Sequence, residues 1–214
     1  MTFLQLVNEV LARLRESSVA SVTTNAYSIM IGKYINDTKQ QVEAAWIWDE
    51  LNTTLTVTTA AGTSNYVVTG IGRKFKNVVV NDSTNKSPLM NVSMQWIRDQ
   101  QQLSTVQNAN PSYYAWNGTN GTDSKIEFYA TPNGVYTIYV HAYIPQADLS
   151  ADADVLTIQS EAVVAGAYAR ALVERGEDGG LSSSEAYGLY KGILADQIAL
   201  EASRQAENQE WVAV

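Results

Sequence analysis

Residues 44–59 read AAWIWDELNTTLTVTT, and the spacing of the apolar residues changes inside this stretch. Upstream of it, apolar residues recur at helical intervals as far as Trp46. From Leu51 onward apolar and polar residues alternate with a period of two, with Leu55 and Val57 on the same side as Leu51. The stretch therefore predicts the passage from a helical region to a β region.

Two helices are predicted upstream of this boundary. In the first, Thr2 to Ser17, Thr2 and Gln5 form a capping-box pattern. Its apolar residues fall on one face and are Phe3, Val7, Val10, Leu11 and Leu14. A second helical pattern follows a Ser/Thr-rich turn and runs from Tyr27 to about Trp46, whose large side chain is interpreted as part of the core. The chain is thus predicted to start with a helical hairpin.

Short strands separated by turn residues fill the middle of the chain. Ser93 is positioned to cap a short helix that interrupts them, and Val135 to Ile144 is the longest predicted strand. Two more helices follow. The first is predicted to be capped by Ser160 and to end near Gly176, and the second begins near Ser182.

Helices at both ends and strands between them predict an α+β fold. We expect a helical bundle made by the N- and C-terminal helical hairpins, residues 1–50 and 148–214, whose last part, about 205–214, is a tail. The bundle carries an inserted antiparallel β domain, sandwich- or barrel-like, at residues 51–147, with the short helix near 93–104.

The charge is distributed unevenly along the chain. The formal net charge is -8, and residues 148–214 carry four basic and twelve acidic side chains, whereas residues 1–147 carry ten of each. Because affinity for phosphates comes from Lys and Arg, an acidic C-terminal third disfavours a protein that grips nucleic acid. No signal peptide and no membrane span are predicted, so we expect no membrane partner and synthesis in the host cytoplasm.

No set of residues assembles into a catalytic or cofactor site. The chain has no cysteine, and His141 is the single histidine, within an alternating strand. A triad needs a nucleophile, an oriented base and an oxyanion site together, so no catalytic residue, cofactor or metal ligand is predicted and the protein is not expected to be an enzyme. Asp148, Asp152 and Asp154 are spaced closely enough to hold Ca²⁺ in a loop, and a solvated linker is the other reading.

Two groups of residues suggest interfaces. Tyr139 and Tyr143 lie on the more polar face of the longest strand, where either an interface or an ordinary surface accommodates them. Trp211, Val212 and Val214 follow the polar run from Gln205 to Glu210. This apolar ending is either a frayed terminus or a docking peptide that inserts its tryptophan into a partner.

Several local signatures occur in an order that resembles the head-to-tail adaptor family of tailed phages. They are AAWIW at 44–48, NPSYY at 110–114, IEFYATP at 126–132, Tyr136 to Ile144, Pro145 to Leu149, and the Ala-rich helix from Ala162. The resemblance spans nearly the whole chain. Ala130-Thr131-Pro132 stands where the family leads us to expect a more proline-rich turn, and residues 104–110 are less familiar.

This resemblance implies a structural protein of the virion neck. It implies a homo-oligomeric ring of twelve copies that docks beneath the portal protein, offers its other side to a tail, nozzle or neck protein, and lets double-stranded DNA pass without specific binding. The family's C-terminal segment reaches toward the portal, which gives Trp211, Val212 and Val214 a docking role. The acidic C-terminal third would suit a channel that repels DNA.

Two other functions remain open from the sequence. One is a β-rich virion module that binds a receptor or glycan through exposed Tyr and Trp, and the other is a different neck or tail completion protein. A glycan-binding module is expected to act as a monomer or trimer that is indifferent to the portal.

Overall fold

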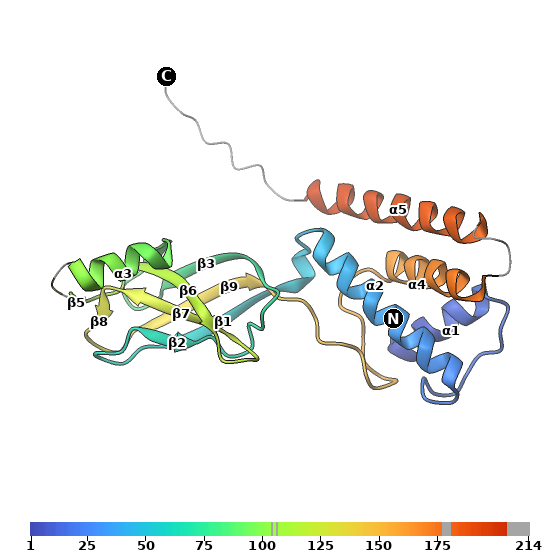
Figure 1. Cartoon of the computed structure of the whole chain (residues 1–214), viewed down its shortest axis with the longest axis horizontal. Coiled ribbons are helices and arrows are strands. Elements are labelled where there is room, and N and C mark those ends of the chain that lie inside the picture. The colour runs from blue at the N-terminus through green and yellow to red at the C-terminus, as the bar shows by residue number, and fades with distance from the viewer. Residues whose placement is uncertain (104, 106, 177–180, 205–214) are drawn as a thin grey trace, which may run out of the picture. The chain divides into compact units, whose positions relative to one another are not determined.

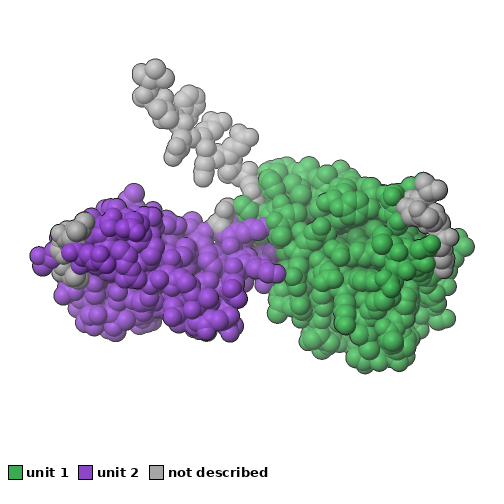
Figure 2. Space-filling view, viewed as in Figure 1, with its two compact units in different colours: residues 1–50, 146–214 green, residues 51–145 purple. Residues whose placement is uncertain are grey.

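The chain forms two compact units. The computed structural model describes residues 1–103, 105, 107–176 and 181–204. One unit combines Met1–Glu50 with Gln146–Val214, and the other is Leu51–Pro145 (Figure 2). The chain leaves the first unit once and returns to it once, so the second unit is an insertion. The predicted α+β fold with an inserted, barrel-like β domain is confirmed.

The helical unit contains four α-helices in the part of the chain that the structure describes (Figure 1). They are α1 (Phe3–Arg13), α2 (Ala26–Ala45), α4 (Ser160–Arg175) and α5 (Leu181–Ala202). The predicted capping box of α1 is confirmed, since the Thr2 and Gln5 side chains each accept the backbone N–H of the other residue. Its predicted apolar face is buried as well. The helix ends at Arg13 rather than Ser17, because Arg15 adopts a left-handed backbone conformation, with φ of 59°.

Two glycines let the helices pack closely. A Cβ atom on Gly32 of α2 would lie 2.9 Å from the Phe3 ring of α1. A Cβ atom on Gly166 of α4 would lie 2.5 Å from Cγ2 of Thr38 and 3.0 Å from the Tyr190 ring of α5. Glycine is therefore required at both positions by helix contacts within the unit.

The ends of α4 differ in how well the sequence predicted them. Gly176 ends the helix in a left-handed conformation, φ 62°, as predicted. The predicted N-cap is wrong: Ser160 is the first helical residue and Gln159 is the N-cap, without a side-chain capping hydrogen bond. A serine inside the first turn satisfies the helical pattern equally well, so sequence spacing alone did not separate the two registers.

The β unit follows a short 3₁₀ turn, η1 (Asp49–Leu51). Its strands are β1 (Asn52–Thr58), β2 (Asn65–Val67), β3 (Lys76–Asp82), β4 (Ser87–Asn91), β5 (Asn108–Ala109), β6 (Tyr113–Thr119), β7 (Ser124–Tyr129), β8 (Thr131–Pro132) and β9 (Thr137–Tyr143). Seven of them form one nearly closed sheet in the order β1-β9-β3-β4-β6-β7-β2, and β5 pairs with β8. The inward residues of β9, Ile138, Val140 and Ala142, are buried in the core of this sheet.

The sequence predicts an antiparallel β domain, whereas the sheet in the structure is mixed. β4 and β6 run parallel, with Met90 opposite Tyr113. The helix α3 (Met94–Leu103) lies between these strands in the chain and provides the crossover that parallel neighbours need. Ser93 caps it as predicted, because its Oγ accepts the Trp96 N–H at 3.1 Å.

The outer face of β6 and β7 is covered by α3. Ile97 of α3 is buried against Ala115 and Tyr129. The carboxylate of Glu127 on β7 accepts hydrogen bonds from Arg98 and Gln101 of α3. Within the described residues, no helix is long and apolar enough to cross a membrane.

Candidate interaction surfaces

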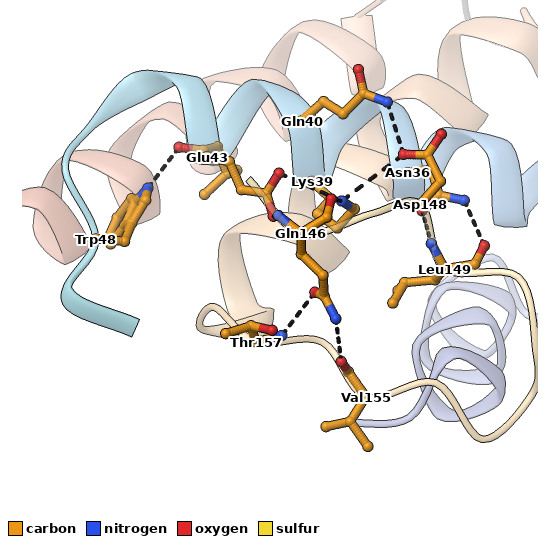
Figure 3. A network of polar contacts seen from close by, with 11 residues as sticks. Asn36, Lys39, Gln40, Glu43, Trp48, Gln146, Asp148, Leu149, Val155 and Thr157 are labelled. Atoms are coloured by element: carbon orange, nitrogen blue, oxygen red, sulfur yellow. Dashed lines mark hydrogen bonds and ion pairs between the residues drawn. The ribbon is translucent and has the colours of Figure 1, made fainter. Parts of the chain in front are cut away.

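A strap of residues 146–159 leads from the β unit to α4 and is bonded to α2 (Figure 3). The Asn36 side chain forms two hydrogen bonds of 2.9 Å with the backbone N–H and C=O of Leu149. The Lys39 ammonium donates to the Gln146 carbonyl at 2.5 Å, and Gln40 donates to Asp148 at 2.8 Å. Three side chains of α2 thus hold residues at the start of the strap.

The strap is also braced on itself and on α1. The Gln146 side chain donates to the Val155 carbonyl and accepts the Thr157 N–H. The backbone N–H groups of Phe3 and Leu4, at the start of α1, donate to the Asp154 and Asp152 carbonyls. Because the first N–H groups of a helix have no partner within it, the strap satisfies groups that would otherwise need water.

A buried ion pair lies under the strap. Lys39 and Glu43 are one helical turn apart on α2, both side chains are almost fully buried, and their charged atoms lie 3.5 Å apart. Glu43 also accepts the Gln146 N–H at 3.2 Å. Burial raises the pKa of the Glu43 carboxyl above its ordinary value, while the Lys39 charge and the Gln146 hydrogen bond oppose that rise.

This raised pKa predicts a definite pH dependence. A carboxyl with a raised folded-state pKa supports folding fully below its ordinary pKa of 4.5, and that support is lost as the pH rises through the raised value. The free energy of unfolding of the wild type, relative to that of Glu43→Gln, is therefore expected to fall as the pH increases above about 4.5. Urea unfolding at a series of pH values measures it, with the exposed Glu50→Gln as control. A relative stability that rises over the same window would contradict the assignment.

The three aspartates of the strap are not gathered around one point. Asp148 accepts from Gln40, Asp152 accepts the Val22 N–H, and Asp154 accepts the N–H groups of Ser150 and Ala151. These last two hydrogen bonds hold the pKa of Asp154 below its ordinary value. Among the described residues, no group of three or more His, Cys, Asp or Glu side chains is arranged to hold a metal ion. The structure thus gives these carboxylates a role in shaping the strap.

Four small residues lie in line along the exposed face of α5. Gly188, Gly192, Ala195 and Ala199 are spaced by four, three and four positions, and all are exposed. A Cβ atom on Gly188 or Gly192 would meet nothing within 4 Å. Unlike Gly32 and Gly166, these glycines are not required by packing among the described residues, and each weakens the helix relative to alanine. We call these four positions the small-residue stripe.

Large apolar side chains flank the stripe on both sides. Leu189 and Leu200 lie along one side and are 62% and 49% exposed, and Tyr187 lies on the other and is 48% exposed. Beyond Tyr187 a groove of about 500 Å³ opens between α2, α4 and α5, with Arg170 and Val173 on its α4 wall. The inner face of α5 is mixed, since the apolar Tyr190 and Leu194 and the polar Ser183, Gln197 and Glu201 are all buried. Large apolar side chains that are exposed beside one another on a helix are typical of an interface.

The predicted aromatic residues of β9 lie in the β unit. Tyr139 is 37% exposed and Tyr143 is partly buried. His141, between them, shares a 2.8 Å hydrogen bond with Thr54 on the neighbouring strand β1. The interface role of the two tyrosines remains a prediction. Trp211, Val212 and Val214 lie outside the described residues.

The small-residue stripe and the buried ion pair were not predicted from the sequence. The spacing of Gly188 and Gly192 was a usable signal for the stripe, because two glycines one turn apart on a helix face permit close approach. The pair of Lys39 and Glu43 has the spacing of an ordinary surface pair, and nothing local distinguishes it as buried.

Comparison with known proteins adds one result. The sequence model of the family described as SU10 adaptor protein matches residues 1–211. A search of curated proteins finds no match to the chain.

Proposed function

The chain belongs to the SU10 adaptor protein family, phage adaptors that are structural components of the virion, and on that premise we propose that it forms a ring. In this proposal twelve copies close into a ring at the virion neck that joins the portal protein to the tail, nozzle or neck protein. Double-stranded DNA passes through its channel without specific binding. The proposal assigns no catalytic step to the protein.

The small-residue stripe is the observation that supports self-association most directly. Two helices approach more closely when the facing side chains are small, and the flanking Leu189, Leu200 and Tyr187 would then bury apolar surface against the neighbour. This arrangement explains why glycine occurs twice on a helix face where it costs about 1 kcal/mol per position relative to alanine. A head-to-tail contact between unlike surfaces closes into a ring when its rotation allows.

Three further features fit the same proposal. Trp211, Val212 and Val214 would dock on the portal as aromatic and aliphatic anchors. Tyr139 and Tyr143 would contribute to a second interface, on the β unit. The acidic residues of the C-terminal third would face the channel, where like charge keeps DNA from adhering to the wall.

Filling the stripe tests the proposed subunit interface. Gly192→Leu should leave the isolated subunit at least as stable, because leucine is the better helix former, by roughly 0.5–1 kcal/mol. Ring formation should weaken by at least about tenfold, since the side chain prevents close approach. Sedimentation velocity of the protein, alone and mixed with its portal, measures the assembled mass. Ala12→Leu, on the exposed side of α1, is the matched control and should assemble like the wild type.

The same mass measurement tests the function itself. Assembly on the portal that is lost on removing residues 205–214 would support both the ring and the docking role of the C-terminal segment. A monomer or trimer that ignores the portal would contradict the proposal and favour a glycan-binding module. If Gly192→Leu assembled normally while the wild type formed a ring, the stripe would not be the interface.

A further inference from the structure

A second, smaller pocket lies between the start of α4 and the C-terminal half of α5. Its volume is about 230 Å³. Its lining residues are Gln159, Glu161, Ile193, Asp196, Gln197 and Leu200. It shares none of them with the groove near Tyr187. The pocket is therefore a separate site from that groove.

Gln197 is the unusual residue of this pocket. Its side chain is 4% exposed, yet neither the amide nitrogen nor the amide oxygen has a hydrogen-bond partner in the structure. Buried amides nearly always have partners, because a group that leaves water without one loses its hydration uncompensated. A missing partner that both donates and accepts would complete this site.

The lining of the pocket restricts what that partner can be. A peptide group offers one N–H and one C=O, which is the pair that the Gln197 amide can accept and donate to. Ile193 and Leu200 favour an apolar side chain beside that peptide group. Glu161 and Asp196 disfavour a negatively charged one. The pocket thus suits a neutral, apolar peptide segment in an extended conformation.

We propose that this pocket binds the apolar segment Trp211–Val214 of the same chain. The helix α5 ends at Ala202, and Leu200 at the pocket lies about one turn before Arg204. Trp211 follows Arg204 by seven residues, which span at most about 25 Å, so the segment can fold back to Gln197. The acidic Glu207 and Glu210 precede the apolar residues in the sequence and are not part of the proposed contact. A short tether also gives the segment a high local concentration at the pocket.

This pocket deepens the proposed function, because the same residues are proposed there to dock on the portal. The pocket would hold the segment in the free subunit, and the portal would compete for it. The binding step itself needs no portal, so it can be tested in the isolated protein.

The test uses the Gln197 side-chain amide as its own reporter in the full-length protein. Its NMR signals are assigned by their loss in Gln197→Leu. We expect Trp211→Ser and Val212→Asp to shift these signals and to speed their exchange with water by about tenfold, as loss of a buried hydrogen bond implies. Asn208→Ser, in the polar run that precedes this segment, is the matched control and should change neither. In Gln197→Leu, trypsin should release the segment after Arg204 about tenfold faster than in the wild type.

Each contrary outcome is distinct. If the Gln197 signals neither shift nor exchange faster in Trp211→Ser and Val212→Asp, the proposal is overturned. Signals that respond but also change on dilution would show that another copy supplies the segment, which overturns binding within one chain. Portal binding without any Gln197 response would refute this inference alone, and the reverse result would refute only the portal-docking role.

Discussion

Replacing Lys39 by methionine is expected to lower the free energy of unfolding of the helical unit by about 3–5 kcal/mol. The ammonium is fully buried, donates to the Gln146 carbonyl, and lies 3.5 Å from Glu43. Methionine fills similar space but leaves the Glu43 carboxylate buried without its counter-charge. Removing one partner of a buried pair costs far more than the pair contributes, because the remaining charge has lost its water as well.

Hydrogen exchange of the α2 amides during urea titration measures this loss in the helical unit. Lys33→Met is the matched control on the same helix, and as an exposed position it should change stability by less than about 0.5 kcal/mol. Lys39→Met combined with Glu43→Leu should recover much of the loss, because no charge remains buried. The recovery is incomplete since the Gln146 N–H and C=O both lose a partner.

A loss of stability for Lys39→Met no larger than that for the exposed Lys33→Met would contradict this account of the buried ion pair. If the single and double variants lost equal stability, the cost would come from packing or from the Gln146 hydrogen bonds rather than from an unpaired charge. A double-mutant cycle separates these contributions because the two side chains are in contact.

Much of the fold could be predicted from periodicity because helices and strands in both units bury side chains at regular intervals along one face. The face of α1 from Phe3 to Leu14 and the alternation of Ile138, Val140 and Ala142 in β9 each follow from local spacing. The parallel pair of β4 and β6 could not be read in the same way. The direction of a strand relative to its neighbour depends on a crossover, and alternation carries no information about it.

The candidate surfaces were less accessible to sequence reasoning for a different reason. On α5 apolar residues occur both on the buried face, as Tyr190, and on the exposed side, as Leu189, so periodicity does not separate the core from the interface. Lys39 and Asn36 bind strap residues more than 100 positions away in sequence. Contacts of this kind exist only once the chain returns from the β unit.

Trp46 and Trp48, at the end of α2, show the same limit of prediction from local spacing. The sequence pattern assigned the core position to Trp46, where the helical spacing ends. In the structure Trp46 is partly buried, and Trp48 is the residue that is 1% exposed. Its indole N–H donates to the Val42 carbonyl at 2.8 Å. Val42 is one of the last residues of α2, whose final carbonyls have no partner within the helix.

Trp48→Ala is therefore expected to destabilise the helical unit by about 3–5 kcal/mol, through lost burial and the cavity left behind. Trp48→Phe retains most of the ring and should cost less, with about 1 kcal/mol attributable to the Val42 hydrogen bond. Trp46→Ala is the matched comparison two residues away, and partial burial should limit its cost to about 1–2 kcal/mol. Urea unfolding with exchange of the α2 amides ranks the three variants. If Trp46→Ala proved as costly as Trp48→Ala, both rings would contribute equally at the end of α2, and the assignment of Trp48 as the residue that closes this helix would be wrong.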